Sequence, residues 1–107
     1  MPEQPAKLTV IWWRDIPAQV TAKAGRATAR AQLGDRFQEA IDAAAMSAGL
    51  LDSDDYLEEW RRVARDCGGD LDAEVAAEAA RLQHAYSDDD LARLARAGGL
   101  ANEKGAE

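Results

Sequence analysis

The acidic residues are the first candidates for chemistry in this sequence. Asp52, Asp54 and Asp55 lie close together, and Asp88–Asp90 form a second acidic run. Carboxylates at alternating positions bind Ca²⁺ in an EF-hand loop, but that loop also needs glycine at its sixth position and glutamate at its twelfth. Neither run has that glycine. Acidic residues are also favoured at helix N-termini, so we interpret both runs as helix starts and predict no metal site.

Cys67 and His84 are the only cysteine and the only histidine in the chain. Two ligands far apart in sequence do not make a zinc site, and a Cys–His nucleophilic pair needs a third group to orient it. The sequence has no glycine-rich phosphate loop, serine elbow or His-Glu-x-x-His motif. We therefore predict no catalytic residue and no cofactor, which favours a non-enzymatic protein without settling the question.

Four basic residues gather around a glycine turn: Lys23, Arg26, Arg30 and Arg36. They could hold an anionic ligand or an acidic partner, or they could form a solvated rim that pairs with acidic helices. Residues 1–36 have six Lys and Arg against three acids, whereas the whole chain carries a net charge of −7. Because phosphate binding needs a basic face, the acidic remainder argues against nucleic acid as a partner.

The tryptophan doublet and the turn after it are the strongest candidates for a protein-binding surface. Adjacent residues on a strand point to opposite faces, so Trp12 and Trp13 cannot both enter one side of a core. If helices cover one face only, one indole is exposed, and exposed Trp beside Arg is typical of a binding hot spot. A sheet covered on both faces would instead bury both rings. The predicted partner-binding residues are Trp12, Trp13, Arg14, Asp15, Pro17 and Gln19.

The hydrophobic pattern indicates the elements that must position these residues. Apolar residues alternate over about 7–14 and 18–24, which predicts an antiparallel hairpin. Residues 28–33 also alternate but are rich in alanine, so a third strand there stays open. The rest of the chain has helical spacing, with helix starts at Asp35, Ser53, Asp70 and Ser87. We expect an α+β fold with four helices at about 35–48, 54–67, 71–86 and 88–97.

A chain of 107 residues is long enough for one domain with one core. We expect a loose lead at 1–6, a single domain at 7–99 and a polar tail at 100–107. A lone cysteine excludes an intrachain disulfide, no apolar run is long enough to span a bilayer, and the N-terminus lacks a signal-peptide layout. These features predict a cytoplasmic protein with no membrane partner.

Four segments together resemble the small bacterial "virulence factor" domain family, which is named for its likeness to the C-terminal part of conserved virulence factor C. The segments are Trp13–Val20, Gly25–Arg26, Arg36–Met46 and Tyr56–Arg62. The resemblance covers roughly residues 8–62 and leaves the last two helices outside. It implies an accessory protein, because stand-alone members often accompany folate- and corrinoid-dependent methyl-transfer enzymes. It carries over no catalytic residue, and its working surface would be Trp13, Arg14, Asp15, Pro17, Gln19, Arg26 and Arg36.

Two functions follow from these observations. The first is a non-enzymatic accessory protein that docks onto an enzyme of one-carbon metabolism through the Trp/Arg/Pro turn. The alternative is a small anion-binding module or minor enzyme that uses the Lys23, Arg26, Arg30 and Arg36 cluster. The sequence leaves open whether the chain also pairs with a second copy of itself.

Overall fold

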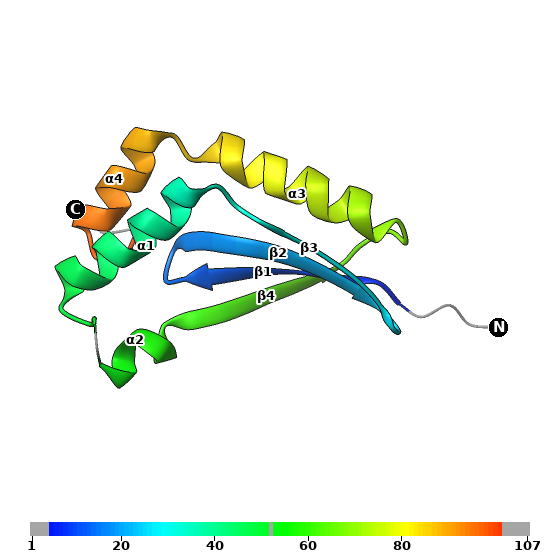
Figure 1. Cartoon of the computed structure of the whole chain (residues 1–107), viewed down its shortest axis with the longest axis horizontal. Helices are drawn as coiled ribbons and strands as arrows, with labels where there is room; N and C mark the ends of the chain where they lie inside the picture. The colour runs from blue at the N-terminus through cyan, green and yellow to red at the C-terminus, as the bar shows by residue number, and fades with distance from the viewer. Residues whose placement is uncertain (1–4, 52, 102–107) are drawn as a thin grey trace.

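The computed structural model describes residues 5–51 and 53–101, and this part of the chain forms an α+β fold (Figure 1). That is the fold class expected from the sequence. The elements in chain order are β1 (Lys7–Trp13), β2 (Ile16–Ala24), β3 (Ala27–Gln32), α1 (Asp35–Ala48), α2 (Asp54–Glu58), β4 (Trp60–Asp66), α3 (Leu71–Ala85) and α4 (Asp88–Arg96).

The strands form one antiparallel sheet in the order β3-β2-β1-β4. Figure 1 shows α3 lying along one face of this sheet, with α1 and α4 at one end. Side chains on alternate positions of β1 and β2 are buried beneath the helices, and they include Leu8, Val10, Val20 and Ala22. No described helix lies along the opposite face of the sheet. The β1 side chains on that face from Lys7 to Ile11 are exposed or half-buried, whereas Trp13 at the end of the strand is buried.

Helices α1 and α4 contribute buried residues to the core at one end of the sheet. Phe37, Ile41 and Ala44 from one stripe of α1 are fully buried, as helical spacing predicts. Leu91 and Leu94 of α4 are also buried, and α1 packs against α4. Many of the α1 core residues are alanine, so the helix can approach its neighbours closely.

The prediction of a single helix over about 54–67 is wrong. Helix α2 ends at Glu58, and Trp60–Asp66 form β4, which pairs with β1 along its whole length. The sheet therefore has four described strands rather than two or three. The apolar residues of this segment fit helical spacing, but β1 would otherwise keep a row of unpaired backbone groups at the centre of the fold. Tertiary pairing decides the conformation here, and Cys67 follows a strand instead of lying on a helix.

The other expected elements agree with the structure more closely. The alanine-rich segment, for which the sequence left strand or helix open, forms β3. Asp70 caps the start of α3, and Ser87 caps the start of α4 in a capping box. Asp35 and Ser53 do not cap through their side chains.

The predicted end segments lie largely outside the described residues, which exclude 1–4 and 102–107. Within the expected loose lead, Ala6 is buried and its carbonyl accepts a hydrogen bond from the Cys67 amide. Among residues 5–51 and 53–101, no helix is both long and apolar enough to cross a bilayer.

Candidate binding surface

The turn between β1 and β2 is tied to distant parts of the chain. Arg14 adopts a left-handed backbone conformation (φ 53°), and its side chain is only 17% exposed. Its guanidinium donates to a Glu59 carboxylate oxygen at 3.1 Å and to the Gly98 carbonyl at 3.0 Å. Asp15 pairs with Arg61 at 3.2 Å and accepts a hydrogen bond from the Ala101 amide at 2.8 Å. The charged residues of this motif therefore bind within the domain.

The two tryptophans have different surroundings. Trp13 is 0% exposed, and its indole N–H donates to the Tyr56 carbonyl at 2.9 Å. Its ring also packs so closely on Gly99 that a Cβ there would lie 3.0 Å from it. Trp12 is half-buried under the Arg61 guanidinium, 5.2 Å from the ring centroid, and its N–H has no partner among the described residues.

The remaining predicted partner-binding residues also separate in the structure. Pro17 is fully buried beside the turn, whereas Gln19 points to the uncovered face of the sheet. The structure therefore uses Trp13 and Pro17 in the core, and Gln19 is the member of the set that lies on an open surface.

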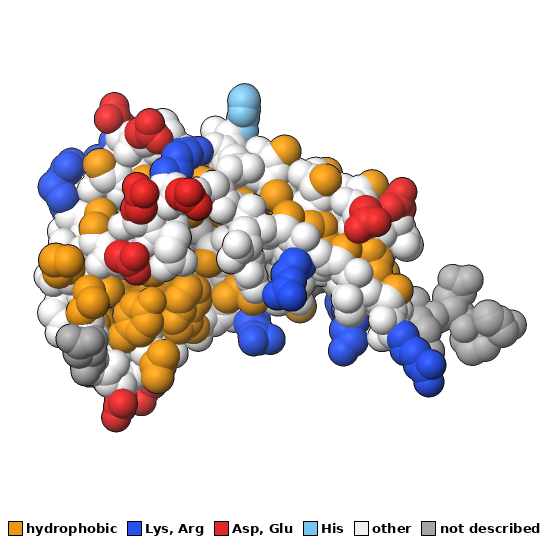
Figure 2. Space-filling model, in the orientation of Figure 1, with side chains coloured by type: hydrophobic (Ala, Val, Ile, Leu, Met, Phe, Trp, Pro, Cys, Tyr) orange, Lys and Arg blue, Asp and Glu red, His pale blue; other side chains and the backbone are white. Residues whose placement is uncertain are grey.

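The uncovered face of the sheet is polar and basic. It consists of alternate side chains of the four strands: Lys7, Thr9, Ile11, Gln19, Thr21, Lys23, Thr28, Arg30, Gln32, Arg62, Ala64 and Asp66. Lys7 pairs with Asp66 at 2.7 Å, but Lys23, Arg30 and Arg62 form no ion pair with the described residues. In Figure 2, Lys and Arg side chains project beneath the sheet, whereas most Asp and Glu side chains lie over the helices.

A hollow lies over β2 and β3 on this face. It has a volume of about 440 Å³, and its polar lining comes from Thr21, Lys23, Thr28 and Arg30. Arg26 lies in the turn that joins the same two strands. The β2–β3 hairpin therefore brings together three of the four predicted anion-binding residues.

Arg36, the fourth of them, is elsewhere. It donates to the Gln83 carbonyl at 2.6 Å and pairs with Asp88 at 3.2 Å. It therefore links the start of α1 to the connection between α3 and α4, and it takes no part in the basic face.

An exposed apolar patch lies between α1 and α2. Figure 2 shows hydrophobic side chains gathered at this end of the molecule. Leu57 is 65% exposed, and Leu51, Tyr56 and Leu57 line a hollow of about 380 Å³. Exposed apolar patches of this kind are typical of protein-binding sites.

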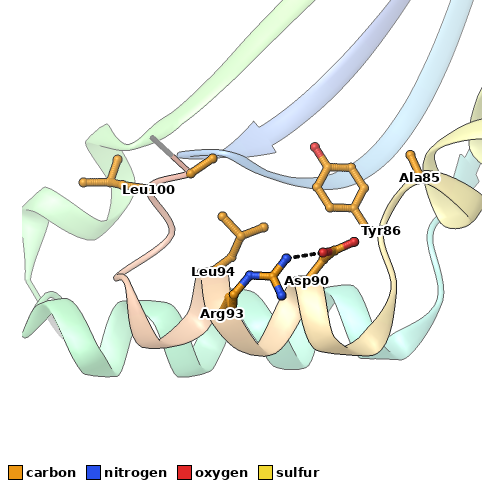
Figure 3. Close-up of a pocket in the computed structure, with 7 residues that line it drawn as sticks. Ala85, Tyr86, Asp90, Arg93, Leu94 and Leu100 are labelled. Atoms are coloured by element: carbon orange, nitrogen blue, oxygen red, sulfur yellow. Dashed lines mark hydrogen bonds and ion pairs between the residues drawn. The ribbon is translucent and has the colours of Figure 1, made fainter. Parts of the chain in front are cut away.

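A smaller pocket of about 200 Å³ lies beside α4 (Figure 3). Its polar groups are Tyr86 and an ion pair between Arg93 and Asp90, and the phenol oxygen points away from that pair. Burial, and then the nearby Asp15 carboxylate, raise the pKa of Tyr86, so the phenol stays neutral at neutral pH. The charged groups of the pocket thus pair with each other, and its other polar group is a neutral hydroxyl.

The buried carboxylate of Glu78 connects α3 to β4. It accepts hydrogen bonds from Arg81 and from Arg65, the latter at 3.4 Å. The hydrogen bond from Arg81 is the main reason that the pKa of Glu78 is lowered, against the opposing effect of burial. Both Glu78 partners are arginines, which keep the carboxylate ionised and make it a structural group.

No group of three or more His, Cys, Asp or Glu side chains within residues 5–51 and 53–101 is arranged to hold a metal ion. Cys67, which directly follows β4, is a free thiol that is half-buried.

A comparison with protein-family models shows which family the chain belongs to. A family model described as "Virulence factor" matches residues 11–95. The chain belongs to the virulence factor family. No curated protein and no solved structure matches the chain. The family match runs from β1 into α4, so it includes the last two helices that the sequence resemblance left outside.

Sequence reasoning missed the residues of this virulence-factor domain that act from β4. Arg62 completes the basic face, and Arg61 holds Asp15 and covers Trp12. Their positions follow from the strand conformation of a segment that reads as a helix. The sequence there has no alternation of apolar and polar residues that could have identified the strand.

Proposed function

We propose that this domain is a non-enzymatic binding protein that docks an acidic protein surface onto the uncovered face of its sheet. The observation that carries this proposal is the charge of that face. Lys23, Arg30 and Arg62 have no ion-pair partner among the described residues, although the whole chain is acidic, with a net charge of −7. Unpaired cations on one face and acids on the others give an oriented field that selects and steers an acidic partner.

The other side chains of the basic face fit a reversible interaction. Thr9, Thr21, Thr28, Gln19 and Gln32 provide hydroxyl and amide groups that stay hydrated in the free domain. The apolar patch at Leu51 and Leu57 adds a surface that a protein can cover but that a free anion cannot use. Together these two surfaces favour a protein partner over a small ligand.

A narrower form of the proposal names the partner as a folate- or corrinoid-dependent enzyme of one-carbon metabolism. This form rests on the resemblance, because stand-alone family members often accompany such enzymes. The geometry of the domain requires only that the partner has an acidic surface. It gives the search for a partner a starting point.

The test compares two variants with the same change of charge. Arg30→Glu reverses a cation in the basic face, whereas Arg96→Glu reverses an exposed cation on α4. A protein captured from the native cytosol is purified, and its direct affinity for each variant is measured. We expect Arg30→Glu to weaken binding by about tenfold or more, with an affinity that falls as salt rises, and Arg96→Glu to bind as the wild type does. Equal affinities of the two variants would contradict the proposal.

A second candidate function is the binding of a small anion in the hollow over β2 and β3. The supporting observation is that Lys23 and Arg30 line one hollow together with the hydroxyls of Thr21 and Thr28. Thermal unfolding with millimolar folates and phosphorylated metabolites tests it, since a ligand bound only by the folded state raises the melting temperature. A rise that Arg30→Glu abolishes would favour this function, and no rise with any compound would count against it.

A further inference from the structure

The outer edge of β4 has no neighbouring strand among the described residues, and the hydrogen bonds at the two ends of β4 show which of its backbone groups point outward. The Arg14 amide donates to the Glu59 carbonyl at 3.2 Å, and the Cys67 amide donates to the Ala6 carbonyl at 3.0 Å. Backbone groups along an antiparallel strand alternate between its two sides, so the odd-numbered residues of β4 face β1. The groups that point outward belong to Trp60, Arg62, Ala64 and Asp66.

This edge lacks two of the features that usually protect an edge strand, a proline and a bulge. Natural edges are blocked by proline, by bulges or by charged side chains that cover them. β4 contains no proline or glycine, and its register with β1 is continuous from Asp66 to Trp60. The bulge in the sheet lies instead between β1 and β2, at Ile11/Trp12. β4 is therefore a regular strand of seven residues with one side free among the described residues.

Two arginines that could shield the edge are held toward the domain. Arg61 donates to the Arg14 carbonyl at 3.1 Å and pairs with Asp15, and Arg65 reaches Glu78 on α3. Arg65 also caps the carbonyl of Asp66, the last residue of the strand, at 3.2 Å. The backbone groups of Arg62 and Ala64, at the centre of the edge, have no such cover among the described residues.

We propose that β4 binds an extended acidic segment of a partner protein as a fifth strand of the sheet. This inference rests on the proposed function and specifies how the partner docks. The strand offers three arginines and one acid, and that acid is already paired with Lys7. Arg61 and Arg65 are paired within the domain but stay about half exposed, and Arg62 forms no ion pair with the described residues. Val63 at its centre is 48% exposed and gives an added strand one apolar neighbour. Backbone hydrogen bonds would supply affinity. An acidic side chain opposite Arg62, with others beside the half-exposed guanidinium groups of Arg61 and Arg65, would supply specificity.

A second copy of the chain fits this edge poorly. In a fully overlapped antiparallel pair of β4 strands centred on Val63, Arg61 of each copy lies opposite Arg65 of the other. Like charges directly opposite each other on neighbouring strands are destabilising. The same positions opposite glutamate would be favourable, so charge complementarity selects an acidic segment.

The probe is the acetylated and amidated peptide KETVEEV, whose glutamates lie opposite Arg61, Arg62 and Arg65 in an antiparallel pair. Its matched control has the same sequence but is N-methylated at the residues opposite Arg62 and Ala64. The two peptides have equal charge and differ in their ability to donate backbone hydrogen bonds. We expect the control to bind at least about tenfold more weakly, because it loses two hydrogen bonds. We also expect amide exchange at Arg62 and Ala64 to slow with the unmodified peptide alone.

Two proline variants test the edge from the side of the protein. Ala64→Pro removes an outward amide of β4, and Thr28→Pro removes an outward amide of β3 at the other edge. The Leu33 amide donates to the Ala18 carbonyl, which places Thr28 on the outer side of β3 by the same alternation. We expect Ala64→Pro to weaken KETVEEV binding by about tenfold and Thr28→Pro, at the opposite edge, to weaken it much less. Circular dichroism of each variant checks that it is folded.

Three results would overturn the strand-addition proposal: equal binding of the two peptides, no binding of either at millimolar concentration, or dimerisation of the chain that protects Arg62 and Ala64. Each would leave the charge test at Arg30 intact. If Arg30→Glu still lowers the affinity for the purified partner, the basic face binds that partner without strand addition. If neither test shows an effect, the proposed function fails as well.

Discussion

Replacing Trp13 separates a structural role of the tryptophan doublet from a docking role. The Trp13 ring is 0% exposed and its N–H donates to the Tyr56 carbonyl. Truncating a buried Trp to Ala costs about 3–5 kcal/mol, and the unpaired carbonyl adds about 1 kcal/mol. A domain of this size is stable by about 5–15 kcal/mol, so Trp13→Ala removes a large share of the total. We expect its melting temperature to fall by roughly 15–30 °C.

Urea denaturation followed by circular dichroism measures these free energies without depending on tryptophan fluorescence. Trp13→Phe keeps most of the apolar volume and loses the hydrogen bond, so it should cost about 1–2 kcal/mol. Trp12→Ala is the matched control, because this ring is half-buried and its N–H is already unpartnered among the described residues. Its removal should be less destabilising than that of Trp13. The reasoning would be refuted if Trp13→Ala cost under about 1 kcal/mol and still reduced partner binding.

Two further changes test the packing and the electrostatics of the fold. Gly99 has a φ of +90°, and a new Cβ there would lie 3.0 Å from the Trp13 ring. Gly99→Ala should therefore lower the free energy of unfolding, measured in urea, by about 1–3 kcal/mol. Gly69→Ala is the control and should change this free energy little, because Gly69 has open space around it. The lowered pKa of Glu78 means that its ionised form stabilises the fold above about pH 4.3 and that this contribution disappears as the pH falls through the folded-state pKa. The free energy of unfolding of Glu78→Gln should therefore depend less on pH in the acid range than that of the wild type. Equal slopes of this free energy against pH would contradict the explanation.

The sequence was sufficient for the elements whose spacing has one interpretation. Alternation gave β1 and β2, and the capping residues Asp70 and Ser87 marked the starts of α3 and α4. The segment of β4 could not be assigned in this way, because its apolar residues Trp60, Val63 and Ala64 fit helical spacing and do not alternate as in a half-buried strand. Its conformation depends on pairing with β1, which lies far away in the chain.

The candidate site shows the same limit. A hairpin places Lys23 and Arg30 close together, so their cluster could be predicted from the turn between them. Burial of the Trp/Arg/Pro turn could not, because Glu59, Arg61 and Gly98 close over it from later parts of the chain. The composition drew attention to this motif, but it could not distinguish a turn that later residues hold in place from an exposed surface.

The measurement that tests the account most directly is a residue-by-residue map of the contact. The chain is labelled with ¹⁵N and titrated with the purified partner, and changes in its amide NMR signals are followed. We predict that the changes gather on the uncovered sheet face around Lys23, Arg30 and Arg62 and decrease with added salt. Changes confined to α3 and α4, or insensitive to salt, would contradict a basic sheet face as the binding surface.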